Sequence, residues 1–405
     1  MVETMEIQKD FKQPEVGVIP EDWEVKKLSE IGESIIGLTY SPSNVKSTGT
    51  LVLRSSNVQN GKLAFKDNVF VEMDLPKRVI VKENDILICV RNGSRQLIGK
   101  CALIDKETAG SAFGAFMSIY RSEFSVFAFH QFQSYSIQRQ INETLGATIN
   151  QITNRDLAAF QIPLPPTKAE QTAIATALND ADALITQLEK LIAKKQAIKQ
   201  GAMQELLKPK DGWEVKNLGQ IADIRRGASP RPIKDPKWFS DSGRGWIRIS
   251  DVTSSNVYLN STTQYLSEDG ARNSVAVNRG DLIMSICATI GIPIIINIPA
   301  CIHDGFVLFQ NYEKELDTFF LYFCLQVKTE ILTGKGQPGT QKNLNTTIVG
   351  DIEIDYPDVD EQRKIGLILR NIDIEISGLE NKLNKYKMIK QGMMQNLLTG
   401  RIRLV

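Results

Sequence analysis

The sequence is poor in the side chains that build disulfides, metal centres and general-base catalysis. It contains only two histidines, His130 and His303, which lie far apart along the chain. Its five cysteines form an odd number without a Cys-x-x-Cys pair, which argues against a disulfide framework and against a zinc site. We therefore expect the cysteines to be small core residues, and the histidines to be structural or surface residues rather than catalytic bases.

Long hydrophobic runs are also missing. The longest, residues 291–300, is too short and too interrupted by proline to cross a bilayer. The first ten residues hold no apolar core of signal-peptide length. Both absences predict a cytoplasmic protein without membrane contact.

Familiar catalytic motifs are missing as well. The chain has no G-x-x-x-x-G-K-[ST] phosphate loop, no H-E-x-x-H, no G-x-S-x-G, and no G-x-G-x-x-G after a strand. It also lacks the Asp/Asn-Pro-Pro-aromatic motif expected of an adenine methyltransferase. The carboxylates of residues 357–361 are faintly similar to a nuclease cluster, but they fit a helix cap better. We expect no catalytic residue, metal or cofactor in this chain.

Charge of one sign does not dominate. The chain has 48 basic and 47 acidic residues, so there is no overall positive field, and any surface for nucleic acid must be local. At 405 residues the chain is too long for one core of ordinary size, which suggests two to three domains.

What the chain does contain is a tandem repeat. Residues 23–28 (Trp-Glu-Val-Lys-Lys-Leu) return as residues 213–218, an offset of 190 (213 − 23). Residues 199–204 return as residues 390–395, an offset of 191 (390 − 199). Between these flanks only short matches survive, so the middles of the two copies have diverged. A unit of this length is a whole domain with a connector, and two copies predict a pseudo-two-fold molecule.

Each copy opens with short β-rich runs punctuated by Asn, Gly and Ser, which predicts a small α/β domain with a strand-rich core. Each copy closes with a long helix. Thr167-x-x-Glu170 and Asp358-x-x-Glu361 fit a capping box at the two helix starts. A helix from Thr167 to Leu207 would be roughly 60 Å long.

Apolar residues recur at three-four spacing along both predicted helices, interrupted by Lys195 and Lys390, which indicates two coiled-coil stripes. A structural hairpin inside one domain is the alternative for a single helix of this kind, but the duplication favours an antiparallel spacer. The predicted packing residues are Ile174, Leu184, Leu188, Leu191 and Ile198 in the first helix, and Ile372, Ile376, Leu379, Leu383, Tyr386 and Met393 in the second.

The fold class predicted is therefore α+β. Two tandem α/β domains with strand-rich cores are separated by two long antiparallel coiled-coil helices in a pseudo-two-fold arrangement. We expect an N-terminal arm and first domain over residues 1–166, a first helix over 167–208, a second domain over 209–357, and a second helix with a tail over 358–405.

Polar and basic side chains gather in loops of both copies. Residues 91–100 place Arg, Asn and Gln on a glycine-containing loop after a predicted strand, and these side chains suit guanine and adenine edges. Residues 225–248 carry seven basic and two acidic residues with three aromatic residues interleaved, which is typical of a phosphate-binding patch. Loops 146–151 and 339–343 precede the helix of each copy. For any single residue a solvated loop is the alternative.

The candidate DNA-contacting residues are Arg54, Asn57, Arg91, Asn92, Ser94, Arg95, Gln96, Lys100, Asn150 and Gln151 in the first copy, and Arg225, Arg226, Arg231, Lys234, Arg244, Arg248, Thr340, Gln341, Lys342 and Asn343 in the second.

These features together resemble the specificity subunits of type I restriction-modification enzymes. The openings at residues 18–25 and, more weakly, 211–215 are similar to the starts of recognition domains in that family. So are the domain ends at residues 162–166 and 354–357, each followed by a Glu-Gln pair. The likeness covers nearly the whole chain.

The resemblance implies two target recognition domains, from Trp23 to about Thr167 and from Trp213 to about Pro357, each reading one half of a bipartite site in double-stranded DNA. It implies that the helices set the spacing and bind two modification (methyltransferase) subunits, and that restriction (translocase/nuclease) subunits join the complex. S-adenosylmethionine, ATP and Mg would then belong to those partner subunits. A coiled-coil protein scaffold and a two-headed DNA-binding regulator are the alternatives. The arm before Trp23 has no counterpart in the second copy, and we expect it to pack near the C-terminal helix and complete a pseudo-symmetric ring; a mobile arm is the alternative.

Overall fold

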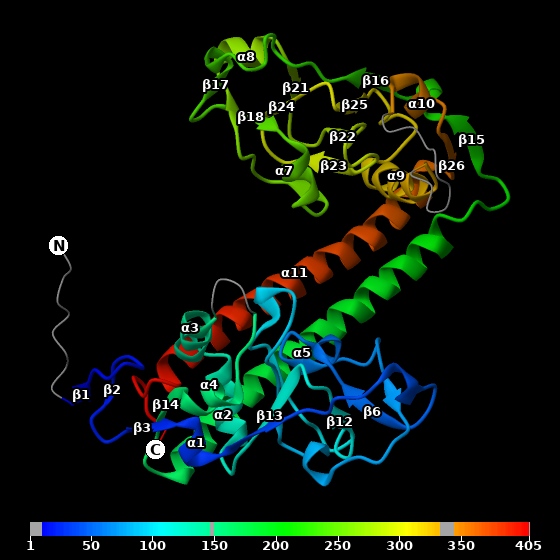
Figure 1. The fold of residues 1–405 in the computed structure, drawn as a ribbon. Helices are drawn as coiled ribbons and strands as arrows, with labels where there is room; N and C mark the ends of the chain where they lie inside the picture. Colours follow the sequence, from blue (N-terminus) through cyan, green and yellow to red (C-terminus); the bar gives the residue numbers. More distant parts are fainter. Residues whose placement is uncertain (1–9, 146–149, 333–343, 405) are drawn as a thin grey trace. The chain divides into compact units, whose positions relative to one another are not determined.

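The chain folds into two compact units, each with one strand-rich domain and part of both long helices (Figure 1). The computed structural model describes residues 10–145, 150–332 and 344–404. The first unit combines residues 1–187 with residues 384–405, and the second comprises residues 188–383. The division agrees with the duplication in the sequence.

In the first unit, a four-stranded antiparallel sheet carries the core, with strand order β11-β10-β13-β4. A second sheet has the order β12-β6-β9-β5. The strands are β4 (Glu33–Ile36), β5 (Val45–Lys46), β6 (Thr50–Leu53), β9 (Phe70–Val71), β10 (Ile86–Cys89), β11 (Cys101–Leu103), β12 (Ala112–Phe113) and β13 (Met117–Arg121).

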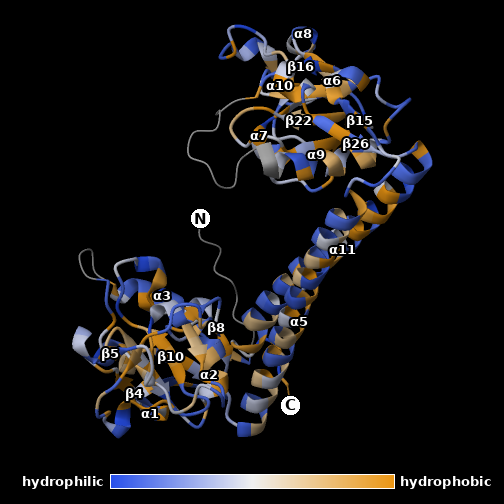
Figure 2. Ribbon diagram, turned by 90° about the vertical axis from the view of Figure 1, so that its right-hand side faces the viewer, coloured by the Kyte–Doolittle hydropathy of each residue, from blue (hydrophilic) through white to orange (hydrophobic). Residues whose placement is uncertain are grey.

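Strand β10 shows how the sequence builds this core. All four of its residues are buried, and side chains alternate between the two faces of a strand. Ile86 and Ile88 belong to the cluster that includes the helices α2 (Ser125–Phe132) and α3 (Tyr135–Thr144). Leu87 belongs to the cluster of the second sheet. The sheet is therefore covered on both faces, which explains the hydrophobic colour around β10 in Figure 2.

The second unit repeats this plan with five strands in each sheet, ordered β16-β25-β22-β23-β19 and β17-β20-β18-β24-β21. The series β16-β25-β22-β23 corresponds to β4-β13-β10-β11 of the first unit. The strands are β16 (Asp223–Arg226), β17 (Phe239–Ser240), β18 (Arg244–Ile247), β19 (Tyr258–Leu259), β20 (Tyr265–Leu266), β21 (Val275–Val277), β22 (Leu282–Ser285), β23 (Pro293–Ile296), β24 (Ala300–Ile302) and β25 (Phe306–Gln310).

The first and last strands of each domain pair with each other. Strand β3 (Glu24–Lys27) pairs antiparallel with β14 (Gln161–Leu164), and β15 (Glu214–Asn217) pairs in the same way with β26 (Glu353–Tyr356). Each domain therefore begins and ends at one place, directly before its long helix. This closure accounts for the agreement of the two copies at their flanks.

The long helices are α5 (Lys168–Leu206) and α11 (Val359–Leu397). Helix α5 agrees within one residue with the predicted helix from Thr167 to Leu207, and α11 begins one residue after the predicted start. In the first unit Lys390 lies 2.7 Å from Asp182. In the second unit Lys195 lies 2.7 Å from Glu375. The first unit also has Glu170 bound to Arg403, beyond the end of α11, and the second has Lys199 bound to Asp373. In each unit the second partner number falls as the number on α5 rises, so the two helices run antiparallel there. The two lysines that interrupt the stripes bind acids of the opposite helix.

The predicted packing stripe needs a correction on α5. Leu191 and Ile198 are 39% and 45% exposed, so the prediction is wrong for these two residues. The buried face instead carries Leu178, Ile185 and Ile192. The predicted residues of α11, from Ile372 to Met393, are all buried or half-buried. No helix within the described residues is both long and apolar enough to span a membrane.

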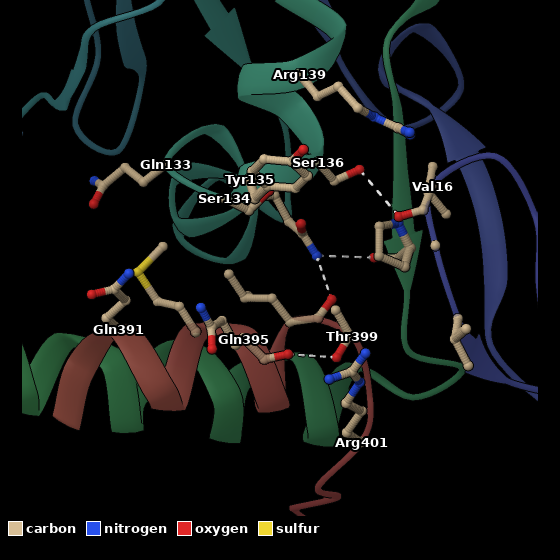
Figure 3. A pocket seen from close by; sticks show the side chains of 16 residues that line it. Val16, Gln133, Ser134, Tyr135, Ser136, Arg139, Gln391, Gln395, Thr399 and Arg401 are labelled. Carbon is tan, nitrogen blue, oxygen red and sulfur yellow. Dashed lines mark hydrogen bonds between the residues drawn. The ribbon is translucent and has the colours of Figure 1, made fainter. Parts of the chain in front are cut away.

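The described part of the N-terminal arm contacts the end of α11, as expected. Strand β1 (Phe11–Lys12) pairs with β2 (Ile19–Pro20), and a side chain placed on Gly400 would collide with the ring of Pro20. Beside the arm lies a cavity of about 480 Å³. Figure 3 shows Gln391 and Gln395 of α11 opposite Tyr135 at the start of α3.

Candidate nucleic-acid interface

In the first domain, the loop after β10 meets a segment from the far end of that domain. Arg91 and Gln151 oppose each other in an antiparallel bridge, and the Asn92 N–H donates to the Asn150 carbonyl at 3.3 Å. Arg91 is exposed and Gln151 is half-buried. The structure thus brings together two loops that the sequence predicted separately.

An exposed aromatic ring completes this corner of the domain. Phe116, directly before β13, is 56% exposed, and the Arg91 guanidinium lies 5.2 Å from the centre of its ring. The backbone N–H groups of Val90 and Arg91 both donate to the Phe116 carbonyl. Phe116 was not predicted, because a single phenylalanine between buried residues reads as core from the sequence.

Several predicted contact residues hold the loop instead. Asn92 donates to the Ser55 hydroxyl at 3.0 Å, and Asn150 donates to the Gly93 carbonyl at 3.0 Å. Arg95 donates to the Asn142 carbonyl at the end of α3. These side chains fix the loop shape through their hydrogen bonds, so we assign them to the support of the site.

Lys100 belongs to the same support. Its ammonium donates to the backbone carbonyls of Ser55 and Val58. Ser94 and Gln96 are exposed, and no hydrogen bond of their side chains is found among the described residues. They remain candidates for contact with a ligand.

One short match between the two copies, Arg54-x-x-Asn57 against Arg248-x-x-Asp251, consists of backbone caps. Asn57 is fully buried and accepts from the Arg54 N–H at 2.9 Å, while the Arg54 side chain pairs with Asp67 at 2.8 Å. Asp251 is also buried and accepts from the Arg248 N–H at 2.9 Å. From this position Asn57 cannot reach a base edge, so we withdraw it from the candidate contacts.

The basic segment of the second domain, residues 225–248, also contains both side chains that support the fold and side chains that are exposed. Arg244 donates to the carbonyls of Val277 and Ala300 and therefore ties strands together. Trp238 and Trp246 are 9% and 1% exposed, so two of the interleaved aromatic residues are core, contrary to a stacking role. The segment supplies less of a surface than its composition predicted.

The remaining basic residues of this segment are exposed: Arg225, Arg226, Arg231, Lys234, Lys237 and Arg248. Their surroundings include one carboxylate that the sequence did not reveal as part of the site, Asp304, whose side chain is 44% exposed.

Asp304 organises part of this basic surface. Its carboxylate accepts from the Ser229 hydroxyl at 2.7 Å and from Arg231 at 3.2 Å, and its backbone carbonyl accepts from Arg226 at 2.8 Å. The Ser229 hydrogen bond lowers the pKa of Asp304, so the group is anionic at neutral pH. Burial lowers the pKa of the adjacent His303, which is therefore neutral there. This surface therefore carries several positive charges and one carboxylate, Asp304, which hydrogen bonds hold in place.

The second domain repeats the loop arrangement of the first with different side chains. Ile152 donates to the Val90 carbonyl after β10, and Leu344 donates to the Ile286 carbonyl after β22. Cys287 therefore occupies the place that Arg91 has in the first domain. The predicted contacts Thr340, Gln341, Lys342 and Asn343 lie outside the described residues.

Within the part of the chain that the structure describes, no cluster of three or more His, Cys, Asp or Glu side chains could hold a metal ion. All five cysteines are free thiols, and four are buried. Burial raises the pKa of the half-buried fifth, Cys287, which keeps it protonated. The exposed Arg, Gln, Ser and Lys side chains are suited to hydrogen bonding with base edges and phosphates.

The chain belongs to the family of type I restriction modification DNA specificity domains, whose model matches residues 20–200 and again residues 210–387. The two matches coincide with the two copies of the repeat, so the duplication is a duplication of this domain.

This chain is also similar to known specificity subunits. The putative type I restriction enzyme MjaX specificity subunit of Methanocaldococcus jannaschii is 26% identical and aligns with 98% of this chain and 97% of its own length. The EcoKI specificity subunit of Escherichia coli is 29% identical over 66% of this chain and 62% of its own. The crystal structure of the S subunit from M. genitalium shares the fold, with a TM-score of 0.62, 16% identity, and coverage of 97% and 98%.

Proposed function

We propose that this chain is the DNA-recognition subunit of a type I restriction-modification complex and that each of its domains reads one half of a bipartite target. The observation that carries this proposal is the duplication itself. Two domains of one family each present exposed polar and basic side chains, Arg91 and Gln96 in one and Arg225 and Lys234 in the other. Phosphate contacts would fix each domain on the duplex, and base contacts would give sequence specificity.

The proposed domain division follows the predicted one. The first recognition domain with its arm covers residues 1–166 and the second covers residues 209–357. Residues 167–208 and 358–405 form the two spacer segments with the tail. Because the two copies share their flanks but not their middles, the two half-sites are expected to differ in sequence.

The helices set the spacing between the half-sites and carry the docking surface for two modification subunits. Support for docking comes from exposed apolar residues seven positions apart, since that spacing places them on one helix face. Leu191 and Ile198 form such a pair on α5, and Leu367 and Ile374, both 53% exposed, form one on α11. An apolar stripe of this kind is suited to a partner helix.

The chain itself acts as a non-catalytic subunit. Modification subunits supply adenine methylation with S-adenosylmethionine, and restriction subunits supply ATP- and Mg-dependent translocation and cleavage. The chain works in the cytoplasm, where these subunits meet DNA. Its own contribution is to choose the site.

The test is to co-express the chain with its modification subunit and map adenine methylation across host DNA by single-molecule sequencing. We expect one split motif, of which one half changes when residues 213–357 are exchanged for those of another family member. A stable complex without any sequence-specific methylation would contradict the proposal and favour a protein scaffold. Sequence-specific DNA binding that persists without any modification subunit would favour the two-headed regulator.

A further inference from the structure

Three residues from separate parts of the first domain meet where β10 ends: Arg91, Phe116 and Gln151. Arg91 pairs with Gln151 in the antiparallel bridge, and the Arg91 backbone N–H donates to the Phe116 carbonyl at 3.1 Å. Asn92 and Asn150 fix the loop around them. The three therefore have defined positions before any ligand is present.

The opposition of Arg91 and Gln151 has a specific geometry. The flanking bonds from Asn92 to Asn150 and from Ile152 to Val90 make them a non-hydrogen-bonded pair. In such a pair the two Cα atoms are about 4.5 Å apart and the side chains leave the same face. That separation is close to the rise of about 3.4 Å between neighbouring base pairs.

Within the described residues Arg91 is without the kind of anionic partner that Arg54 of the same domain has. Among the described residues no carboxylate pairs with its guanidinium, whereas Arg54 is paired with Asp67. Its guanidinium lies over the face of the Phe116 ring. A cation over a ring is held by the electron-rich face, so the N–H donors of the guanidinium stay available. Phe116 thus orients Arg91 without consuming its hydrogen-bonding capacity.

We infer that Arg91 and Gln151 read two neighbouring base pairs in the half-site of the first domain. Arg91 takes a guanine through O6 and N7, Gln151 takes an adenine through N6 and N7, and Phe116 is the positioning residue for Arg91. The inference rests on the proposed function and adds to it which bases one domain selects and through which side chains.

The second domain supports the assignment by contrast. The residue at the Arg91 position is Cys287, a half-buried thiol that cannot make a bidentate contact with guanine. The Arg–Gln pair is therefore particular to the first domain. The guanine and the adenine that this pair reads belong to the half of the split motif that stays unchanged when residues 213–357 are exchanged.

The experiment uses the complex with the modification subunit and compares wild type with R91K, Q151A and F116L. We expect R91K to keep its charge and its affinity for unrelated DNA but to lose the preference for guanine by about 5-fold to 150-fold, the range of one bidentate contact. Q151A loses the preference for adenine at the neighbouring position. F116L weakens the guanine preference less than R91K does, because it removes only the ring that orients Arg91.

The matched control is K106A, because Lys106 is an exposed basic residue of the same domain that lies beyond the end of β11 opposite this loop; it should leave the motif unchanged. The other half of the motif is an internal control in every variant. A wild-type first half without guanine, or an R91K motif that keeps its guanine, overturns the inference while the proposed function stands. Failure of the wild-type complex to methylate any bipartite motif overturns the proposed function instead.

Discussion

Arg403, six residues beyond the end of α11, binds Glu170 in the first turn of α5 through two hydrogen bonds. Nε donates to Oε1 and Nη2 donates to Oε2 at 2.8 Å, and the guanidinium lies 5.8 Å from the centre of the Trp23 ring. Glu170 is 1% exposed. The start of one helix, the tail of the other and the first tryptophan of the domain therefore meet at one residue.

The second unit contains a corresponding ion pair, which is more exposed than the pair in the first unit. Lys210, four residues beyond the end of α5, lies 3.0 Å from Glu361 in the first turn of α11 and 5.7 Å from the centre of the Trp213 ring. Here both partners are exposed, at 51% for Lys210 and 38% for Glu361. In each unit the first-turn glutamate of one helix binds the basic residue that follows the other.

This difference in burial predicts unequal effects of two matched substitutions. R403A leaves a buried carboxylate without its partner and should destabilise the first unit by about 3 kcal/mol. K210A removes an exposed pair and should cost the second unit less than about 1 kcal/mol. Hydrogen exchange read by mass spectrometry reports the opening of each unit separately. Equal losses in the two units would contradict this account.

A second prediction concerns acid stability. His130 is fully buried, and burial lowers its pKa to about 4, although its Nε2 bonds to Asn179 at 2.9 Å. Lys390 also lowers the pKa of His130, and Asp182 raises it. Between about pH 6.5 and pH 4 the unfolded chain holds a proton on this histidine that the folded chain rejects, so stability falls as the pH falls through this window.

The measurement is urea denaturation of wild type and H130N between pH 7 and pH 4.5. The wild type should lose up to about 3 kcal/mol more than the variant over this range, since one pKa unit corresponds to about 1.4 kcal/mol. Parallel pH profiles would show that His130 is not the group responsible. H303N is a useful comparison, because the pKa of His303 is lowered by burial as well.

The buried face of α5, which differs from the predicted one, gives a third prediction. Leu178 is fully buried, so L178A should cost about 2 to 5 kcal/mol of stability. L191A, at an exposed position of the same helix, should leave stability nearly unchanged and weaken binding of the modification subunit. Thermal melts and co-purification separate the two effects. A large loss of stability in L191A would mean that Leu191 packs against the opposite helix, as the sequence predicted.

The error in that stripe has a simple physical origin. Leu184, Leu191 and Ile198 follow a seven-residue spacing as well as Leu178, Ile185 and Ile192 do, so α5 carries two adjacent apolar rows. Periodicity finds both rows, but only the position of the opposite helix decides which is buried. On α11 the residues predicted to pack are buried or half-buried.

The candidate site was predictable in part for a similar reason. The residue types and the two loops of the first domain were visible in the sequence, and the duplication pointed to their importance. The division between contact and support was not visible, because Arg91 and Arg95 look alike until Phe116 and the end of α3 are placed beside them. Phe116 and Asp304 escaped prediction because each acts through residues distant in the sequence.

The last prediction tests the helices as a spacer. Removing residues 188–194 from α5 together with residues 377–383 from α11 takes one heptad from each helix. The deletion lies between the Asp182–Lys390 pair of the first unit and the Lys195–Glu375 pair of the second, so both pairs are retained. Seven residues make nearly two full turns, so each buried face turns by only about 20°.

The deletion shortens the helix pair by about 10 Å, which corresponds to roughly three base pairs of duplex. Methylation mapping should therefore show both half-sites unchanged in sequence and the gap between them reduced by about this amount. Removing only residues 188–194 is the control, because it leaves α11 at full length and breaks the pairing of the helices. An unchanged gap in the double deletion would mean that something other than these helices sets the distance.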